Sequence, residues 1–268
     1  MLYNRTMAGD CQTSIRKDLY ERGAFRCERS EQVAVDLLTA NTAQMVTLPP
    51  TVSPKEFMTF YTGSKLRWEA LGIFLTSCGL CIAGLSAKDI ELEFNGRSEQ
   101  DKQRLMFRLL EASDICVSLC DDAGYGTDWG FWLMIENCMY ASQVLGDAHY
   151  LVWRKLGDLS TAVFARSYHA IGQKSGPFWL DEMRRRALGY TYAMEKMLSA
   201  FVGRPPRISK RYCNIGIPLD IGSYQVLSAG NDINLALAAV DEDGWNTGVK
   251  RRTLKECRHT PARSYLRV

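Results

Sequence analysis

Apolar residues recur every three or four positions along most of the chain, which is the period of an α-helix with one buried face. The clearest example lies between residues 105 and 119, where the intervals are four, three, four and three. Its apolar positions are Leu105, Leu109, Ala112, Cys116 and Leu119. Ser98 and Asp101 precede it with the spacing of a reciprocal helix cap. A glycine-rich turn at 121–126 is predicted to end this helix.

The same period predicts a series of further helices, separated by glycine, proline and polar breaks. Their approximate ranges are 31–43, 66–85, 128–145, 149–156, 160–171, 178–201 and 224–240. Few segments alternate between apolar and polar residues as a half-buried strand does. The predicted fold class is therefore all-α, a multi-helix domain of stacked antiparallel helices.

Prolines mark one predicted domain edge. Pro49, Pro50 and Pro54 interrupt the helical pattern, and the composition before them is mixed. We interpret residues 1–47 as an N-terminal extension that is partly irregular. Residues 48–247 are predicted to form the main domain.

Basic residues gather in two places, although the net charge of the whole chain is only +3. Residues 248–268 hold seven lysines and arginines and one acid, and they are predicted to form a basic C-terminal tail. Within the tail, Lys250, Arg251 and Arg252 are a candidate nuclear-import signal or phosphate-contacting patch. The second group lies at 184–211, and a basic run of this kind is usually a solvated helix face.

The composition fits a globular chain with a sizeable core, since 46% of its 268 residues are hydrophobic. Its nine cysteines are odd in number, and several lie within apolar helical patterns, which indicates a reducing compartment, cytosol or nucleus. The uncharged stretch 70–87 has the minimum length of a membrane span. Its three glycines and three hydroxyl residues favour a buried core helix instead, so no membrane partner is expected.

Enzyme signatures are sparse. Neither a G-x-x-x-x-G-K-[ST] phosphate loop nor a G-x-S-x-G nucleophile motif occurs, and none of the three histidines belongs to an H-E-x-x-H motif. Cys78 with Cys81, and Cys116 with Cys120, have the spacing of thiolate pairs on a helix face, as in a four-cysteine zinc site. Their apolar surroundings favour small core residues. We assign no catalytic, cofactor-binding or metal-ligating residue and expect a protein that is not an enzyme.

Three aspartates keep one enzymatic alternative open. Asp121, Asp122 and Asp128 are similar to the acidic cluster with which all-α isoprenoid synthases hold magnesium against a diphosphate. However, Gly124 and Gly126 interrupt the helix that such a cluster needs, and the third carboxylate of D-D-x-x-D is missing. A solvated turn is favoured. The alternative function is a magnesium-dependent isoprenoid-diphosphate enzyme.

A longer pattern lies between residues 181 and 218. It comprises an E-x-R-R-R helix segment, an acid–base pair, a serine, a G-R-P-P-x-I turn, a cysteine and a proline. These signature residues are Glu182, Arg184, Arg185, Arg186, Glu195, Lys196, Ser199, Gly203, Arg204, Pro205, Pro206, Cys213 and Pro218. In order and spacing they resemble the middle homology region of fungal zinc-cluster transcription factors, also called the fungal-specific transcription factor domain.

The resemblance covers most of the chain, about residues 48–247. Segments 63–69 and 241–246 also look like parts of the family pattern. One departure is Leu188 followed by Gly189, where many family members have two tryptophans.

A larger departure concerns the DNA-reading module of the family, a binuclear zinc cluster held by six cysteines. Residues 1–47 contain only Cys11 and Cys27. The chain is therefore expected to be a shortened family member or an incomplete gene model. By this resemblance, zinc belongs only to full-length members, and DNA is bound only through the module absent here.

The resemblance implies a regulator that controls transcription in the nucleus. Its candidate partners are other transcription-regulatory proteins, a second copy of the chain and a small-molecule effector. No cofactor is expected in this chain.

The motif also makes physical predictions. Glu182 and Arg186 are spaced i,i+4 and are predicted to pair on the outer face of their helix. Consecutive arginines fan around a helix, so at least one of Arg184–Arg186 must approach the core and find a carboxylate or carbonyl partner. Glu195 is predicted to meet a basic group of a neighbouring helix, and Arg204 to cap carbonyls at the helix end. We interpret the motif as scaffold rather than ligand site.

Overall fold

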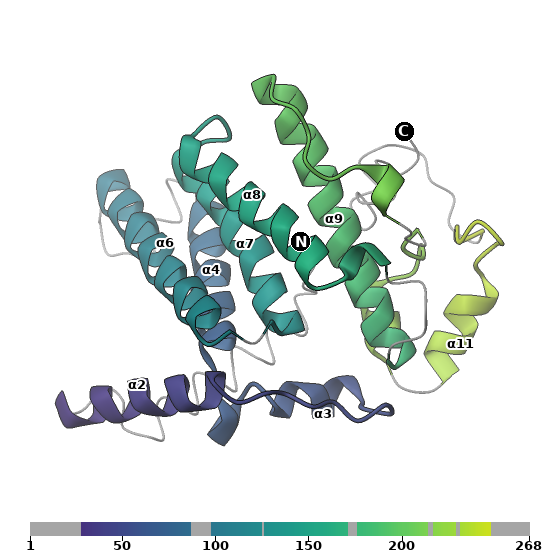
Figure 1. Ribbon diagram of the computed structural model, residues 1–268, viewed down its shortest axis with the longest axis horizontal. Helices are drawn as coiled ribbons and strands as arrows, with labels where there is room; N and C mark the ends of the chain where they lie inside the picture. Colours follow the sequence, from purple (N-terminus) through teal and green to yellow (C-terminus); the bar gives the residue numbers. More distant parts are fainter. Residues whose placement is uncertain are drawn as a thin grey trace. The chain divides into compact units, whose positions relative to one another are not determined.

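The computed structural model describes residues 28–86, 98–124, 126–170, 176–213, 217–228 and 231–247. Within these ranges the secondary structure is helical, apart from one isolated antiparallel β-bridge between Val240 and Asn246 (Figure 1). The all-α prediction is confirmed. None of the helices described is long and apolar enough to cross a membrane.

Most helices begin and end near the predicted positions. The reciprocal cap of Ser98 and Asp101 opens α6, and the side chain of Thr127 caps α7. The α-helices are α2 Glu28–Thr42, α3 Pro54–Thr59, α4 Trp68–Ala83, α6 Glu99–Asp122, α7 Asp128–Leu145, α8 Tyr150–Ala165, α9 Phe178–Val202, α10 Ser223–Leu227 and α11 Asn231–Ala238. The short 3₁₀ helices are η1 Gly63–Lys65, η2 Tyr168–Ala170 and η3 Lys210–Tyr212.

The predicted break between residues 156 and 160 is wrong, because α8 continues through Gly157. Leu156, Leu159 and Val163 are fully buried and extend one apolar stripe past the glycine. The packing of this stripe outweighs the low helix propensity of glycine, a penalty of about 1 kcal/mol.

The predicted helix 224–240 is wrong as a single element. It is divided into α10 and α11, and Ser228 after α10 has an extended backbone, with φ −74° and ψ 139°. The hydroxyl of Ser228 donates to the carbonyl of Gln225 at 2.9 Å. Such a local side-chain bond competes with helix continuation.

The described chain forms two compact units. One, here named the helix-bundle unit, contains the described residues of 28–47 and 58–156. The other, named the α9 unit, contains those of 48–57 and 157–247. The predicted main domain 48–247 includes parts of both, and its boundaries stay a prediction.

The core of the helix-bundle unit forms where α4, α6 and α7 pack against one another. Two glycines of α4 permit the close approach of α7. A Cβ at Gly79 would lie 2.1 Å from Cζ of Tyr140, and a Cβ at Gly72 would lie 2.7 Å from both Cδ atoms of Leu133. The same glycines that argued against a membrane span in the sequence therefore allow close helix packing in a buried core.

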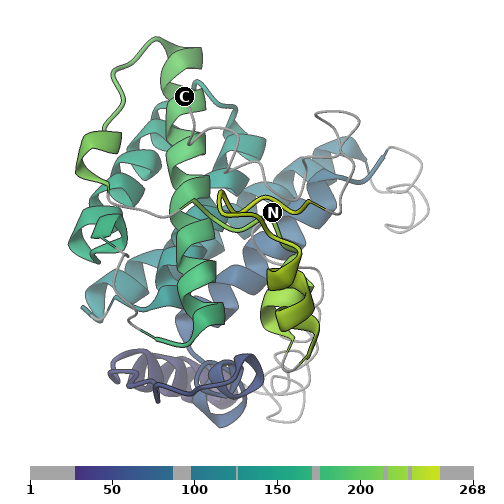
Figure 2. The same ribbon diagram turned by 90° about the vertical axis from the view of Figure 1, so that its right-hand side faces the viewer.

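The α9 unit is organised around the long helix α9, which is visible in green in Figure 2. Near its start, the indole of Trp179 packs edge-on against Phe57, with ring centroids 5.1 Å apart. The indole N–H donates to the carbonyl of Val52 at 2.8 Å. At its end, Gly203 adopts the left-handed conformation with φ 65° and ψ 31°, as the predicted glycine stop requires.

Candidate functional site

The signature residues lie on α9 and on the chain that follows it. We name the described residues 204–213 and 217–221 the return segment, since they double back beside α9 (Figures 1 and 2). Two buried carboxylates of α9, Glu182 and Glu195, hold this segment at two points. All of these residues belong to the α9 unit.

Glu182 has no exposed surface and uses both carboxylate oxygens. Its Oε1 accepts from Nε of Arg186 at 2.9 Å and from the backbone N–H of Leu219 at 2.9 Å. Its Oε2 accepts from Nε of Arg185 at 3.0 Å. The carboxylate therefore links its own helix to the return segment beside Pro218, which is buried.

Arg186 completes this first contact. Its guanidinium donates to Oγ of Ser223 at 3.0 Å and to the carbonyls of Leu219 and Ile221 at 3.3 and 2.8 Å. The prediction that one arginine of the run would reach the core and find carboxylate and carbonyl partners is confirmed.

The predicted outer-face position of the Glu182–Arg186 pair is wrong. The i,i+4 pairing itself exists, but the side chains are only 0% and 9% exposed. The reason is tertiary: the return segment covers this side of α9 and presents backbone groups that need charged partners. Arg184 pairs with Asp181 at 3.4 Å, so part of the charge of the basic run is balanced within its own helix.

Glu195 makes the second contact with the return segment. It is also fully buried, and its Oε1 accepts from the backbone N–H groups of Arg207 and of Ile208, the latter at 3.2 Å. Its Oε2 accepts from Nζ of Lys196 at 2.8 Å, and the same ammonium donates to the carbonyl of Ile208. The predicted partner on a neighbouring helix is therefore wrong, because backbone amides of the chain leaving α9 occupy that oxygen.

Backbone N–H groups cap the end of α9, and the predicted cap by the Arg204 side chain stays a prediction. The N–H groups of Gly203 and Arg204 both donate to the carbonyl of Ser199. The hydroxyl oxygen of Ser199 is buried and has no hydrogen-bond partner among the described atoms. Pro205 and Pro206, both exposed, then direct the chain into the return segment.

Cys213 is the last signature residue of this stretch and is half-buried. Burial raises the pKa of its thiol, while the nearby ammonium of Lys196 acts in the opposite direction. The thiol is therefore not primed as a nucleophile, since nucleophilic cysteines have a lowered pKa.

The downstream segment 241–246 contacts the end of the return segment. The backbone N–H of Asn246 donates to Oδ2 of Asp220 at 3.0 Å, and the N–H of Asp220 donates to the carbonyl of Gly244 at 2.9 Å. This segment, which sequence comparison with the family pattern singled out, thus supports the same region as Glu182.

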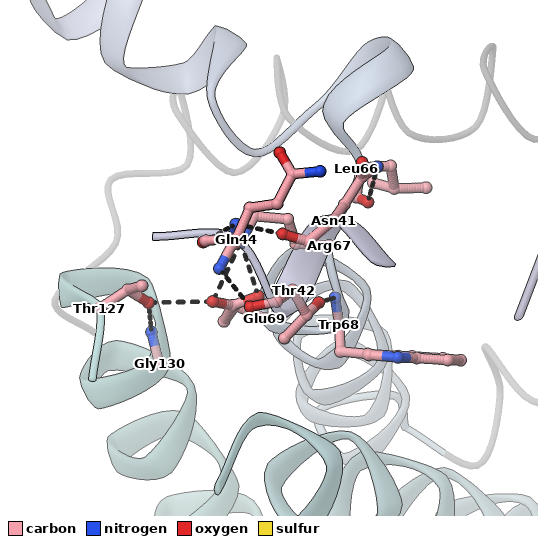
Figure 3. Close-up of polar contacts among 9 residues, drawn as sticks. All are labelled: Asn41, Thr42, Gln44, Leu66, Arg67, Trp68, Glu69, Thr127 and Gly130. Carbon is pink, nitrogen blue, oxygen red and sulfur yellow. Dashed lines mark hydrogen bonds and ion pairs between the residues drawn. The ribbon is translucent and has the colours of Figure 1, made fainter. Parts of the chain in front are cut away.

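A second buried polar cluster lies in the helix-bundle unit, around Arg67 and Glu69 (Figure 3). The two side chains are 3% and 1% exposed, and Nε of Arg67 lies 3.2 Å from each carboxylate oxygen of Glu69. The remaining guanidinium donors bind the carbonyls of Asn41, Thr42 and Gln44 at the end of α2. A cation at a helix C-terminus satisfies these carbonyls and the helix dipole together.

The same cluster also joins two helix N-termini. Oγ1 of Thr42 accepts from the first amide of α4, that of Trp68, at 3.0 Å. Oγ1 of Thr127 donates to Glu69 at 3.1 Å and accepts from the N–H of Gly130 at 3.0 Å, which starts α7. In the sequence, segment 63–69 stood out only as part of the family pattern, so this cluster was not predicted. An arginine and a glutamate on either side of Trp68, directly before a long uncharged stretch, were the available signal.

The three aspartates of the enzymatic alternative lie at the end of α6 and the start of α7. Asp121 and Asp122 are the last residues of α6, and Asp128 is the first residue of α7. Among the described residues, no three histidine, cysteine or acidic side chains are placed to hold one metal ion. The geometry therefore adds no support to a magnesium site.

The four cysteines whose spacing resembles a zinc site are free thiols and differ in their surroundings. Cys116 is buried, Cys78 and Cys120 are half-buried and Cys81 is exposed. Burial raises the pKa of Cys116 to about 12. The prediction of small core residues is confirmed for Cys116 and is wrong for Cys81, which lies near the end of α4.

The predicted basic patch at Lys250, Arg251 and Arg252 lies outside the described residues. Within the α9 unit, the signature residues make interlocking bonds to backbone groups, which is what a scaffold does chemically.

No family model, no curated protein and no solved structure matches the chain.

Proposed function

We propose that the chain is a nuclear, non-enzymatic regulator of transcription that corresponds to the middle homology region of a fungal zinc-cluster transcription factor. The observation that carries the proposal is that signature residues of α9 bind the backbone directly after the signature prolines. Glu182 binds the residue after Pro218, and the Glu195–Lys196 pair binds the two residues after Pro206. Residues that match a family pattern by chance have no reason to meet in this way.

The same contacts define what the signature does in this proposal. The acid–base residues hold the return segment against α9, so they act as scaffold and leave other surfaces to meet regulatory proteins or an effector. No zinc-dependent, sequence-specific DNA binding is expected from this sequence, which lacks the six-cysteine cluster.

A tethering experiment tests the proposal. The chain is fused to a heterologous DNA-binding domain in a yeast reporter strain, and reporter output is compared with that of the DNA-binding domain alone. A change of about fivefold or more in either direction is expected. A matched control is the fusion carrying Arg104→Gln, whose side chain is 76% exposed in the other unit and which is expected to behave as the unaltered chain.

Two outcomes contradict the proposal. Reporter output equal to that of the DNA-binding domain alone, with the fusion present in the nucleus at normal levels, removes the regulatory role. Nanomolar, sequence-specific gel-shift binding by the untethered chain with stoichiometric zinc contradicts the absence of a DNA reader.

A further inference from the structure

Ser209 lies in the return segment, directly after the residue that Glu195 and Lys196 bind, Ile208. Ser209 is exposed, whereas Ile208 is fully buried. The backbone of Ser209 is extended, with φ −93° and ψ 131°. The buried neighbour therefore fixes the segment on α9, while Ser209 itself stays accessible on a backbone that is not helical.

The hydroxyl of Ser209 makes one weak hydrogen bond among the described contacts. Its Oγ accepts from the backbone N–H of Arg211 at 3.3 Å. This distance is longer than the roughly 2.7–3.2 Å of an ordinary N–H···O bond. The oxygen can therefore turn towards an incoming group without the loss of a strong hydrogen bond.

Cations lie close to Ser209 on both sides in the sequence. Arg207 precedes it by two residues, Lys210 and Arg211 follow it directly, and all three are exposed. Residues 196–219 contain no aspartate or glutamate. Among the serines that the structure describes, Ser209 alone is exposed and has a lysine or arginine within two positions on each side. Exposure and charge together therefore distinguish this serine from the others described.

We propose that Ser209 is a phosphorylation site for a serine kinase that selects basic residues on both sides of its substrate. Patterns of charge around the substrate residue are one way in which kinases achieve specificity. An exposed, extended segment can enter the cleft of another enzyme directly, whereas a serine within a helix first requires local opening of that helix. Ser118 is a serine of the second kind, because it is exposed on α6 and has no lysine or arginine within two residues.

The transfer uses ATP as the phosphoryl donor. Oγ of Ser209 forms a bond to the γ-phosphorus, and the bond from that phosphorus to the oxygen that bridges to the β-phosphate breaks. ADP leaves with the bridging oxygen, and the hydroxyl proton passes to the catalytic aspartate of the kinase. Residues 207–211 contain three cations and no acid, so the new group of about −1.5 to −2 charges lowers their net charge from +3 to about +1.

A kinase assay on the full chain tests the proposal. The purified chain is incubated with Mg²⁺, ATP and a purified serine kinase that selects basic flanking residues, and mass spectrometry maps the phosphate to individual serines. Ser209 is expected to be modified at least about tenfold faster than Ser118. A purified kinase that selects acidic flanking residues is expected to leave Ser209 unmodified.

Paired variants test whether the flanking charges are recognised. Lys210→Gln with Arg211→Gln is expected to slow the modification of Ser209 at least about tenfold. Arg104→Gln with Arg108→Gln is the control, because it removes the same number of exposed charges from α6 of the helix-bundle unit, and it is expected to leave the rate unchanged. Each changed side chain is exposed, so circular dichroism is expected to show that both variants fold as the unaltered chain does.

Several results overturn the proposal. These are absence of phosphate on Ser209 with the kinase that selects basic flanks, modification of Ser118 as fast as that of Ser209, or a rate that is unchanged in the Lys210→Gln, Arg211→Gln variant. Equally fast modification of Ser209 by the kinase that selects acidic flanks also overturns it. The inference does not depend on a role in transcription, since the kinase assay and the reporter output are separate measurements and one can fail without the other.

Discussion

The helix-bundle unit and the α9 unit each bury an arginine–glutamate pair, but the two pairs satisfy different kinds of backbone. In the helix-bundle unit, Arg67 binds carbonyls at the end of α2, and Glu69 binds the hydroxyl of Thr127, which caps α7. Thr42 caps α4 beside them, so the pair lies where helix ends leave amides and carbonyls without a partner in their own helix. In the α9 unit, Arg186 and Glu182 bind an extended segment that has no sheet partner. In both units the buried charges lie where regular secondary structure leaves backbone groups unpaired.

The two pairs also differ in which parts of the sequence they connect. Glu182 and Arg186 are a turn apart on one helix and organise the chain about 35 residues downstream. Arg67 and Glu69 lie at a helix start and bring together segments on both sides of it in the sequence. Loss of the first pair should therefore loosen one segment, and loss of the second should loosen a junction of helices.

The largest expected effects come from removing one carboxylate of either pair. Glu69→Ala and Glu182→Ala each leave a buried guanidinium without its counter-charge, so each should lower the free energy of unfolding by about 3–5 kcal/mol. Urea denaturation measures the loss. Glu99→Ala is the control, because Glu99 is 57% exposed in its ion pair with Lys102, and its loss should be below about 0.5 kcal/mol.

Hydrogen exchange distinguishes the two variants. Glu182→Ala should lose amide protection mainly at residues 219–221, whereas Glu69→Ala should lose it at the end of α2 and the starts of α4 and α7. The comparison fails if both variants lose protection at the same amides or if either is as stable as the control.

The next effect concerns the close packing of α4 against α7 in the helix-bundle unit. Gly79→Ala places a Cβ 2.1 Å from the ring of Tyr140 and should lower the free energy of unfolding by about 1–3 kcal/mol. Gly84→Ala is the matched change at the end of the same helix, where the nearest atom is 3.5 Å away. Thermal denaturation that finds the two variants equally stable would contradict the close α4–α7 contact.

A pH series tests the effect of a buried carboxyl outside the two compared pairs, that of Glu136 of α7, which is 5% exposed. Burial raises the pKa of Glu136 above its ordinary value of 4.5. A carboxyl of this kind contributes stability below pH 4.5 that is lost as the pH rises through its folded pKa. Glu136→Gln cannot ionise, so it should unfold at higher urea than the unaltered chain at pH 8, with the difference shrinking towards pH 4.5. A difference that is independent of pH would show that burial of the charge does not set the stability.

The smallest effect is expected at a signature residue. Ser199 has a buried hydroxyl without a hydrogen-bond partner among the described atoms, so Ser199→Ala should change the free energy of unfolding by only about 0–1 kcal/mol, in the stabilising direction. Ser113 is the comparison, because its buried hydroxyl donates to Leu110 at 2.9 Å and accepts from Asn137 at 2.8 Å. Ser113→Ala should destabilise by about 1–2 kcal/mol. A larger loss at Ser199 than at Ser113 would mean that this hydroxyl binds a partner and that the signature is more than scaffold.

Helix periodicity was sufficient to predict α6, α7 and α9, and the ends at Ser98 of α6 and at Gly203 of α9 follow from local sequence signals. It failed at Gly157 and at Ser228, where the outcome depends on burial in one case and on a side-chain bond in the other. A period identifies the face that prefers burial, but it does not weigh a local break against packing from elsewhere in the chain.

The same distinction between local pattern and tertiary packing applies to the candidate site. Spacing alone predicted that Glu182 and Arg186 would pair, because residues four apart on a helix are neighbours. It could not predict that the pair is buried, since the return segment that covers it lies more than 30 residues away. The Arg67–Glu69 cluster escaped prediction for the same reason, because its partners at 41–44 and 127 meet it only in the folded unit.

The sequence by itself determined the all-α class, most helix positions, the pairing of residues one turn apart and the acid-free stretch after Glu195, because each follows from local period or composition. Only the tertiary structure decided which charges are buried, which backbone groups they satisfy, and that Met197 and Phe201 stay exposed at the end of a helix that is otherwise largely covered. The physical reason is that burial depends on the solvent removed by distant segments, and a local pattern contains no record of which segments those are.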